Sequence, residues 1–357
     1  MTGTKPAHPE TLHGVQVLRG FAALGVVIFH GAYAVGSPTL HKMLFNGAAG
    51  VDVFFVISGL VMAVTASRMT SGEFLMKRIT RIVPIYWLFL TLKIATVATL
   101  NVSERSIPLD AGYLIQSYLF IPAYDGDGLV FPPITAGWTL NFEMYFYVIC
   151  ALALLINRAR FALITAAIVG VGAVIGTLLI ASASSRLPAA LYLLSPIALE
   201  FVAGLLLGHL WRKRLLPPAW AALILLAGAL IVLPLTPPME QFELMRPLYW
   251  GLPAFGIVLA IVALEKPARF ARWTPFVLLG DASYALYLSH TATLPVAFKI
   301  VSRFVHQPVP ALMILVVIAI VVGIFTHLLI EKPLGRMVKY AMESGQRLVP
   351  RLGTTGS

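Results

Sequence analysis

The chain has 357 residues, of which 59% are hydrophobic and only 11% are charged. This composition excludes an ordinary soluble globular protein and is typical of a polytopic membrane protein. The formal net charge of +11 does not indicate a nucleic-acid-binding protein, because the basic residues are dispersed between apolar runs. The single cysteine, Cys150, excludes an internal disulfide framework and any cysteine-rich metal site.

The apolar runs predict an all-α bundle of about ten transmembrane helices. A membrane-spanning helix needs roughly 20 mostly apolar residues. The runs that meet this requirement lie near 15–35, 48–66, 84–101, 136–156, 161–182, 189–211, 218–235, 248–264, 276–298 and 309–330. Residues 1–14 are polar and do not have the pattern of a removable signal peptide, so the first helix is expected to serve as an uncleaved signal.

Most lysines and arginines fall in alternate loops, on one side of the predicted bundle. The positive-inside rule places that side, and both chain ends, in the cytoplasm. The expected organisation is a cytoplasmic segment 1–14, a transmembrane domain 15–335 and a cytoplasmic tail 336–357. The longest outer loop, 102–135, is either a lid over a substrate site or a simple connection.

The first span contains LRGFAALGVVIFH, which places Arg19 and His30 in an otherwise apolar helix. Ionisable groups at membrane depth are costly and therefore need a partner or a function. Eleven residues make about three helical turns, so both side chains share a face and lie roughly 16 Å apart along the axis. We therefore predict a groove from Arg19 at the cytoplasmic edge to His30 beyond the midplane. The alternatives are a snorkelling anchor for Arg19 and a core histidine for His30.

The second span opens with GVDVFFVISG, residues 50–59, and carries Asp52 at about the depth of His30. An aspartate beside a histidine suits general-base chemistry, because the carboxylate fixes the imidazole tautomer and stabilises the protonated ring. Ser58 lies about two turns deeper. Its spacing permits a nucleophile, but a serine that packs against a neighbouring helix is the commoner case.

The fourth span opens with WTLNFEMYFY, residues 138–147. Glu143 is expected in the outer half of the bilayer, where it would join the Asp52 and His30 cluster. Its neighbours are Trp138, Asn141, Tyr145 and Tyr147. Aromatic residues with polar tips are typical of an interfacial belt, and also of a surface that stacks on sugars.

The segment FLMKRITRIVPIYW, residues 74–87, predicts an amphipathic helix at the cytoplasmic interface that ends at Pro84. Its basic residues Lys77, Arg78 and Arg81 share one flank. They would either attract anionic lipids or bind phosphate groups, which a guanidinium holds bidentately.

The ninth span contains GDASYALYLSH, residues 280–290. Tyr284, Tyr287 and His290 recur on one helical face, and Asp281 continues the stripe, which should face the bundle interior. The sequence contains no recognisable metal-ligand spacing and no phosphate-cradling glycine loop.

Taken in order, these segments resemble the acyltransferase-3 family of integral-membrane acyltransferases, with bacterial exopolysaccharide O-acetyltransferases as the nearest group. The resemblance covers residues 15 to about 335. It rests on Arg19 and His30 with ten residues between them, on the Gly50–Gly59 signature, and on further segments in the expected order. Those segments are RITRIVPIYW, WTLNFEMYFY, SYALYLSH and the EKP at 331–333.

The resemblance implies a multi-pass O-acyltransferase of the bacterial inner membrane. Such an enzyme moves an acyl group, with acetyl expected, from cytoplasmic acyl-CoA to a hydroxyl of a cell-surface or exported polysaccharide or its lipid-linked precursor. Acetyl-CoA is then a co-substrate, and no tightly bound cofactor and no metal are expected. The other expected partners are the saccharide acceptor, membrane lipid and the polysaccharide assembly machinery, but no nucleic acid.

The resemblance also suggests roles for residues of this chain. His30 would be the general base, with Asp52 and Glu143 orienting it or holding the acceptor. The remaining candidates are Arg19, Arg78, Arg81, Ser58 and Tyr86 for the donor, and Tyr284, His290, Trp138 and Asn141 for the substrate or its tunnel. Tyr284 and His290 are also candidate oxyanion donors.

Three alternatives remain at the level of sequence. Direct transfer is preferred to an acyl-enzyme because no convincing serine or cysteine lies beside His30, although an acyl-histidine is compatible with the pattern. A secondary transporter or flippase for a saccharide would also carry charged residues in its spans, but its usual internal repeat is not visible. A non-catalytic scaffold for polysaccharide assembly would not need Arg19 and His30.

Overall fold

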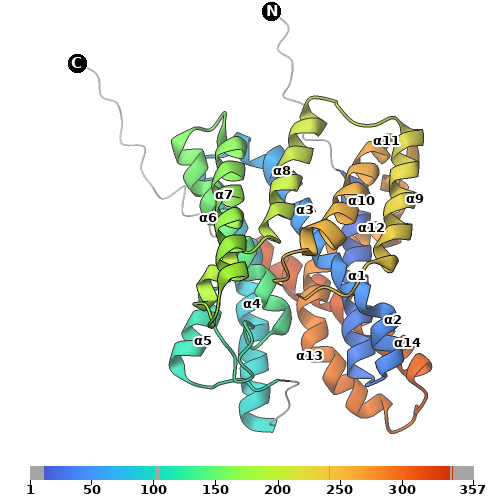
Figure 1. Cartoon of the computed structure of the whole chain (residues 1–357). Helices are drawn as coiled ribbons and strands as arrows, with labels where there is room; N and C mark the ends of the chain where they lie inside the picture. The colour runs from blue at the N-terminus through green and yellow to red at the C-terminus, as the bar shows by residue number, and fades with distance from the viewer. Residues whose placement is uncertain (1–11, 101–104, 241, 338–339, 341–357) are drawn as a thin grey trace, which may run out of the picture.

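In the computed structural model, which describes residues 12–100, 105–240, 242–337 and 340, the chain is a helical bundle (Figure 1). No β-strand occurs among those residues, so the predicted all-α class is confirmed. The α-helices are α1 (His13–Ala34), α2 (Pro38–Leu44), α3 (Gly50–Thr65), α4 (Ser71–Leu100), α5 (Ala111–Tyr118), α6 (Trp138–Ile156), α7 (Phe161–Ser182), α8 (Ala198–Arg212), α9 (Ala219–Leu235), α10 (Leu252–Ala263), α11 (Glu265–Ala268), α12 (Thr274–Asp281), α13 (Ser283–Val301) and α14 (Pro308–Thr326). Short 3-10 helices are η1 (Phe45–Ala49), η2 (Ala66–Arg68), η3 (Thr135–Gly137), η4 (Ala189–Leu194) and η6 (Phe270–Arg272), and π-helices are η5 (Pro247–Gly251) and η7 (His327–Glu331).

Many of the helices have the length and apolar composition needed to cross a membrane. Within the described residues, seven are long and apolar enough to span a bilayer, and the bent pair Pro247–Ala263 and Glu265–Arg272 raises this to eight. Two of the ten predicted spans do not meet this criterion of helix length and apolar character. Helix α9 is apolar but shorter, and the predicted span 276–298 is divided between α12 and α13.

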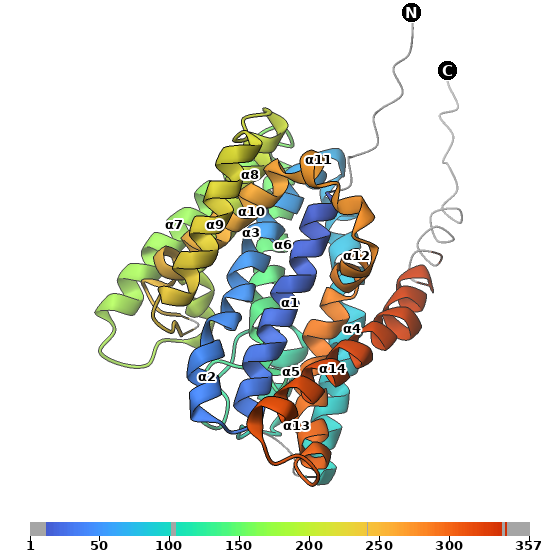
Figure 2. The ribbon, with the colours of Figure 1, turned by 90° about the vertical axis from the view of Figure 1, so that its right-hand side faces the viewer.

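Helix α1 runs through the middle of the bundle (Figure 2). It packs against α3, α10, α12, α13 and α14. Ten of its residues are buried, most of them small or β-branched, which lets the neighbouring helices approach closely. Its polar residues Arg19 and His30 are therefore surrounded by protein on several sides.

Helix α4 corrects one prediction. The expected interfacial helix ending at Pro84 is instead the first half of a single helix that continues through the proline to Leu100. A proline inside a helix removes one hydrogen bond and costs about 3 kcal/mol in water. Buried side chains on both sides of it, including Phe74, Ile82 and Leu90, keep the two halves packed against the bundle, and neighbouring helices are known to make such prolines tolerable in membranes.

Helices α3 and α8 cross at very close range through two glycines. A Cβ atom added to Gly59 would lie 2.1 Å from the Phe201 carbonyl oxygen, and one added to Gly204 would lie 2.1 Å from the Val56 carbonyl oxygen. Both obstacles are backbone atoms, which cannot move aside as a side chain can. The α3–α8 contact therefore requires glycine on both helices, as expected for small-residue packing in membranes.

Gly59→Ala should consequently destabilise the fold by separating α3 from α8. We expect a loss of about 1–3 kcal/mol, the usual cost of overpacking a tight site, seen as a lower thermal unfolding midpoint in detergent. Gly170→Ala is the matched control, because nothing lies within 4 Å of its added Cβ. Equal midpoints for the two variants would contradict the close crossing.

The loop between α4 and α6, which contains α5, lies at one end of the bundle (Figure 1). Arg105 forms an ion pair with Asp125 at 2.7 Å, and the Tyr113 hydroxyl donates to the Phe131 carbonyl at 2.7 Å. Burial, reinforced by the charge of Asp125, raises the pKa of Tyr113 above its usual range, so this hydroxyl stays protonated as a donor. The part of the predicted outer loop at 102–104 lies outside the described residues.

Candidate active site

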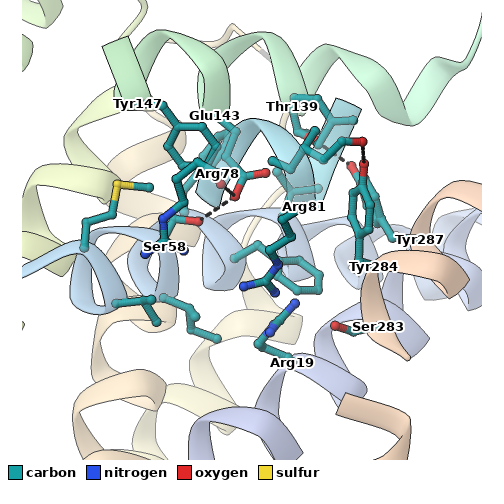
Figure 3. Close-up of a pocket in the computed structure, with 18 residues that line it drawn as sticks. Arg19, Ser58, Arg78, Arg81, Thr139, Glu143, Tyr147, Ser283, Tyr284 and Tyr287 are labelled. Carbon is teal, nitrogen blue, oxygen red and sulfur yellow. Dashed lines mark hydrogen bonds between the residues drawn. The ribbon is translucent and has the colours of Figure 1, made fainter. Parts of the chain in front are cut away.

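A group of charged side chains inside the bundle lines a cavity of about 90 Å³, here called the arginine cavity (Figure 3). Its polar lining comes from α1, α3, α4, α6 and α13 and consists of Arg19, Ser58, Arg78, Arg81, Thr139, Glu143, Tyr147, Ser283, Tyr284 and Tyr287. Sequence reasoning grouped three of these arginines as a donor site, and the structure brings them together.

The arginines of this cavity outnumber its carboxylates. Arg78 donates to the Thr65 hydroxyl at 3.0 Å and Arg19 donates to the Gln16 side chain at 3.1 Å. Within the described part of the chain, neither these two arginines nor Arg81 forms an ion pair. Figure 3 shows the side chains of Arg19 and Arg81 directed toward each other. Like charges so close in a partly buried site favour an anion between them.

Glu143 is the carboxylate of the arginine cavity, and its position differs from the prediction. One of its oxygens accepts hydrogen bonds from the Tyr147 hydroxyl at 2.8 Å and the Ser58 hydroxyl at 3.3 Å. The expected grouping of Glu143 with His30 at the outer end was wrong. The side chain of Glu143 is instead directed to Ser58 on α3.

A second and larger cavity, of about 350 Å³, lies next to the first and is here called the histidine cavity. Its lining includes His30, His41, Arg105, Glu240 and Arg246, and the aromatic residues Phe29, Tyr33, Phe45, Phe131, Trp138 and Tyr287. Aromatic faces with polar groups between them suit a sugar ring, which presents apolar faces and polar edges.

The two cavities have two lining residues in common, Val51 and Tyr287. The Tyr287 hydroxyl lies 3.0 Å from the Thr139 hydroxyl and 3.3 Å from the Ala136 carbonyl. These contacts hold the tyrosine at the boundary between the cavities. Sequence reasoning placed Tyr287 on an inward-facing stripe but did not select it as a site residue.

His30 contacts a second histidine. Its Nδ1 lies 3.0 Å from the Val26 carbonyl oxygen and 3.2 Å from Nε2 of His290. The Nδ1 of His290 lies 3.2 Å from the Leu286 carbonyl oxygen. His30 is partly exposed and lines the histidine cavity, whereas His290 is completely buried and does not line it. The expectation that His290 lines a substrate tunnel was therefore wrong.

Asp52 does not orient His30, contrary to the prediction. Its two carboxylate oxygens accept hydrogen bonds from Nε and a terminal nitrogen of Arg246, at 3.0 and 2.7 Å. Arg246 also donates to the Glu240 carbonyl at 3.1 Å and lies 4.7 Å from the ring centre of Trp250. The sequence could not indicate this pair, because the two residues are separated by 194 positions.

Breaking this buried pair should destabilise the protein strongly. Arg246→Met leaves the Asp52 carboxylate, which is completely buried, without a counter-charge, and the expected cost is about 3–5 kcal/mol. The double variant Asp52→Asn with Arg246→Met removes both charges and should recover much of the lost stability. Thermal unfolding in detergent measures the stability of the single and the double variant. A double variant no more stable than Arg246→Met alone would show that the ion pair is not the cause.

The remaining predicted residues are divided between the site and the core. Tyr284 lines the arginine cavity, but its hydroxyl donates to the Ile82 carbonyl at 2.7 Å, so it is not a free oxyanion donor. Tyr86 is buried, donates to the Ser117 carbonyl at 3.0 Å and lines neither cavity. Asn141 is buried beside Trp138 and faces a separate small pocket.

Comparison with known proteins identifies the class of this site. A family model described as an acyltransferase domain matches residues 12–328. A multi-pass helical bundle with this match is a membrane acyltransferase, and the chain belongs to the acyltransferase-3 family. The resemblance noted from the sequence motifs is thus confirmed, and the protein is an O-acyltransferase enzyme.

Several curated proteins are similar over most of this chain. The exopolysaccharide production protein ExoZ of Rhizobium meliloti (strain 1021) is 33% identical over 319 residues, which cover 87% of this chain and 95% of ExoZ. Acyltransferase MdmB of Streptomyces mycarofaciens is 25% identical, covering 93% of this chain and 94% of MdmB. O-acetyltransferase OatA of Staphylococcus aureus is 23% identical, covering 85% of this chain but 53% of OatA. No solved structure gives a significant match.

Proposed function

We propose that this enzyme transfers an acetyl group from cytoplasmic acetyl-CoA to a hydroxyl of an exported or cell-surface polysaccharide or its lipid-linked precursor, at the bacterial inner membrane. The observation that carries the proposal is the pair of adjacent cavities, one rich in arginine and the other containing His30, which share Val51 and Tyr287. The similarity to an exopolysaccharide production protein supports a polysaccharide as the acceptor.

The arginine cavity is the proposed donor site and faces the cytoplasm. Its arginines lack ion-pair partners among the described residues, and guanidinium groups bind phosphate bidentately. The phosphates of CoA would lie against Arg19, Arg78 and Arg81. The narrow pantetheine arm would then extend past Val51 and Tyr287, which brings the thioester toward His30.

The histidine cavity is the proposed acceptor site. A sugar would stack on its aromatic lining and present one hydroxyl to the His30 ring. His30 removes the hydroxyl proton while the oxygen attacks the thioester carbonyl. The C–S bond then breaks, the proton passes to the CoA sulfur, and an ester and free CoA leave. The reaction needs no further oxidant, reductant or hydrolysed nucleotide.

The test uses the purified protein in nanodiscs with acetyl-CoA labelled on the acetyl group. We expect CoA release that depends on an added polysaccharide extract from the host, with label recovered in the polysaccharide. An absence of both donor binding and CoA release with every acceptor fraction would contradict the proposal. A saccharide flux driven by an ion gradient would then be measured, because that result would support transport instead.

A further inference from the structure

The structure places a completely buried histidine behind the proposed base. His290 lies on α13 and His30 on α1, and their ring centres are 4.9 Å apart. Among the described residues, the polar side-chain atom that contacts His30 is Nε2 of His290, which lies 3.2 Å from the His30 Nδ1. From the sequence, His290 is predicted only to line a tunnel or to donate to an oxyanion.

The hydrogen bonds of the two rings fix their protonation pattern. A backbone carbonyl only accepts, so the contact of His290 Nδ1 with the Leu286 oxygen requires a proton on that nitrogen. In a neutral ring, the Nε2 of His290 is then an acceptor. The Nδ1–H of His30 donates to this acceptor and to the Val26 oxygen. The Nε2 of His30 consequently carries a lone pair and no proton.

We propose that His290 is a positioning residue that holds His30 in the tautomer with a basic Nε2. This inference rests on the proposed function, in which His30 is the general base. His290 acts on His30 much as a carboxylate acts on the histidine of a catalytic triad, by accepting from Nδ1–H and stabilising the ring once it is protonated. A neutral imidazole performs this role without placing a second charge inside the membrane.

The burial of the two rings supports this division of roles. His30 is partly exposed to the histidine cavity, where an acceptor can reach it, while His290 is 0% exposed and lies behind it. Tyr287 packs near His290, with ring centres 5.8 Å apart. His290 therefore influences the reaction through His30 and does not touch the substrate.

The experiment compares His290→Ala, His290→Gln and Ser289→Ala in nanodiscs, measuring acetyl transfer, acetyl-CoA binding and thermal unfolding. His290→Ala should lower kcat by roughly 10–100-fold with little change in the Kd for acetyl-CoA. This loss is smaller than the ~10⁴-fold loss for a wrong tautomer in a serine protease, because Val26 still accepts from Nδ1–H. His290→Gln keeps an acceptor near the Nε2 position and should restore most of kcat. Ser289→Ala is the control, since this neighbour is also buried and also donates to the Leu286 carbonyl.

A second readout separates positioning from a merely structural role. If His290 acts only through His30, adding His290→Ala to a His30→Gln variant should cause no further loss of kcat. An unchanged kcat in His290→Ala would overturn the inference, and so would equal losses of kcat in His290→Ala and His290→Gln. In either case, active wild-type enzyme would leave the proposed function intact. Inactive wild-type enzyme would instead count against the proposed function.

Discussion

His30→Gln should lower kcat for acetyl transfer by about 10²–10⁴-fold, the usual contribution of a general base. Glutamine keeps a polar side chain of similar reach but cannot accept and return a proton. His30 lines the histidine cavity and not the arginine cavity, so the Kd for acetyl-CoA should stay within a few-fold of wild type. The rate of CoA release measures kcat, and equilibrium binding of labelled acetyl-CoA measures the Kd.

His41→Gln provides the matched control for this prediction. His41 lines the same cavity, and its ring packs near those of Phe29 and Phe45. A loss confined to His30→Gln would identify His30 as the base. Losses of equal size in both variants would show that substitution of any histidine in this cavity damages acceptor binding, and the base assignment would then fail.

The double variant Arg19→Gln with Arg81→Gln should weaken acetyl-CoA binding by about 10²–10⁴-fold. Each charge-assisted hydrogen bond contributes about 1.5–3 kcal/mol, so two such bonds to phosphate account for this range. The same variant should unfold at an equal or higher temperature than wild type. The reason is that neither arginine pairs with a carboxylate in the described residues, and the two charges repel each other.

The prediction is specific because acetyl-CoA binding should weaken while thermal stability should stay equal or rise. A variant that simply misfolds would lose both binding and thermal stability. Arg212→Gln is the control, because Arg212 is exposed at the end of α8 and lines neither cavity. Unchanged acetyl-CoA binding in the double variant would remove the arginine cavity as the donor site.

The sequence was sufficient to predict the helical class and the approximate positions of most spanning helices, because long apolar runs admit few other structures in a bilayer. It also predicted that Arg19, Arg78 and Arg81 would gather, although they lie on two different helices. Their common feature was placement near one end of predicted spans. Depth along a helix can be counted from residue numbers, and depth alone was enough to predict that the three arginines lie together.

The errors concern direction around a helix axis and contacts between distant segments. Glu143 was expected beside His30, but the rotation of α6 directs it to Ser58 on α3. The depth of Asp52 predicts His30 as its partner, whereas its partner is Arg246, which directly precedes η5 in the second half of the chain. Pro84 was read as a helix end, since local propensity does not include the tertiary packing that holds α4 together.

In the proposed function, donor and acceptor enter from opposite ends of the bundle and react where the two cavities meet. Proteoliposomes with the protein in one orientation test it directly, with labelled acetyl-CoA on one side of the membrane and the polysaccharide acceptor only on the other. We expect labelled polysaccharide on the acceptor side and free CoA on the donor side, with no transfer by His30→Gln. Transfer that occurs only when both substrates are on the same side would contradict it.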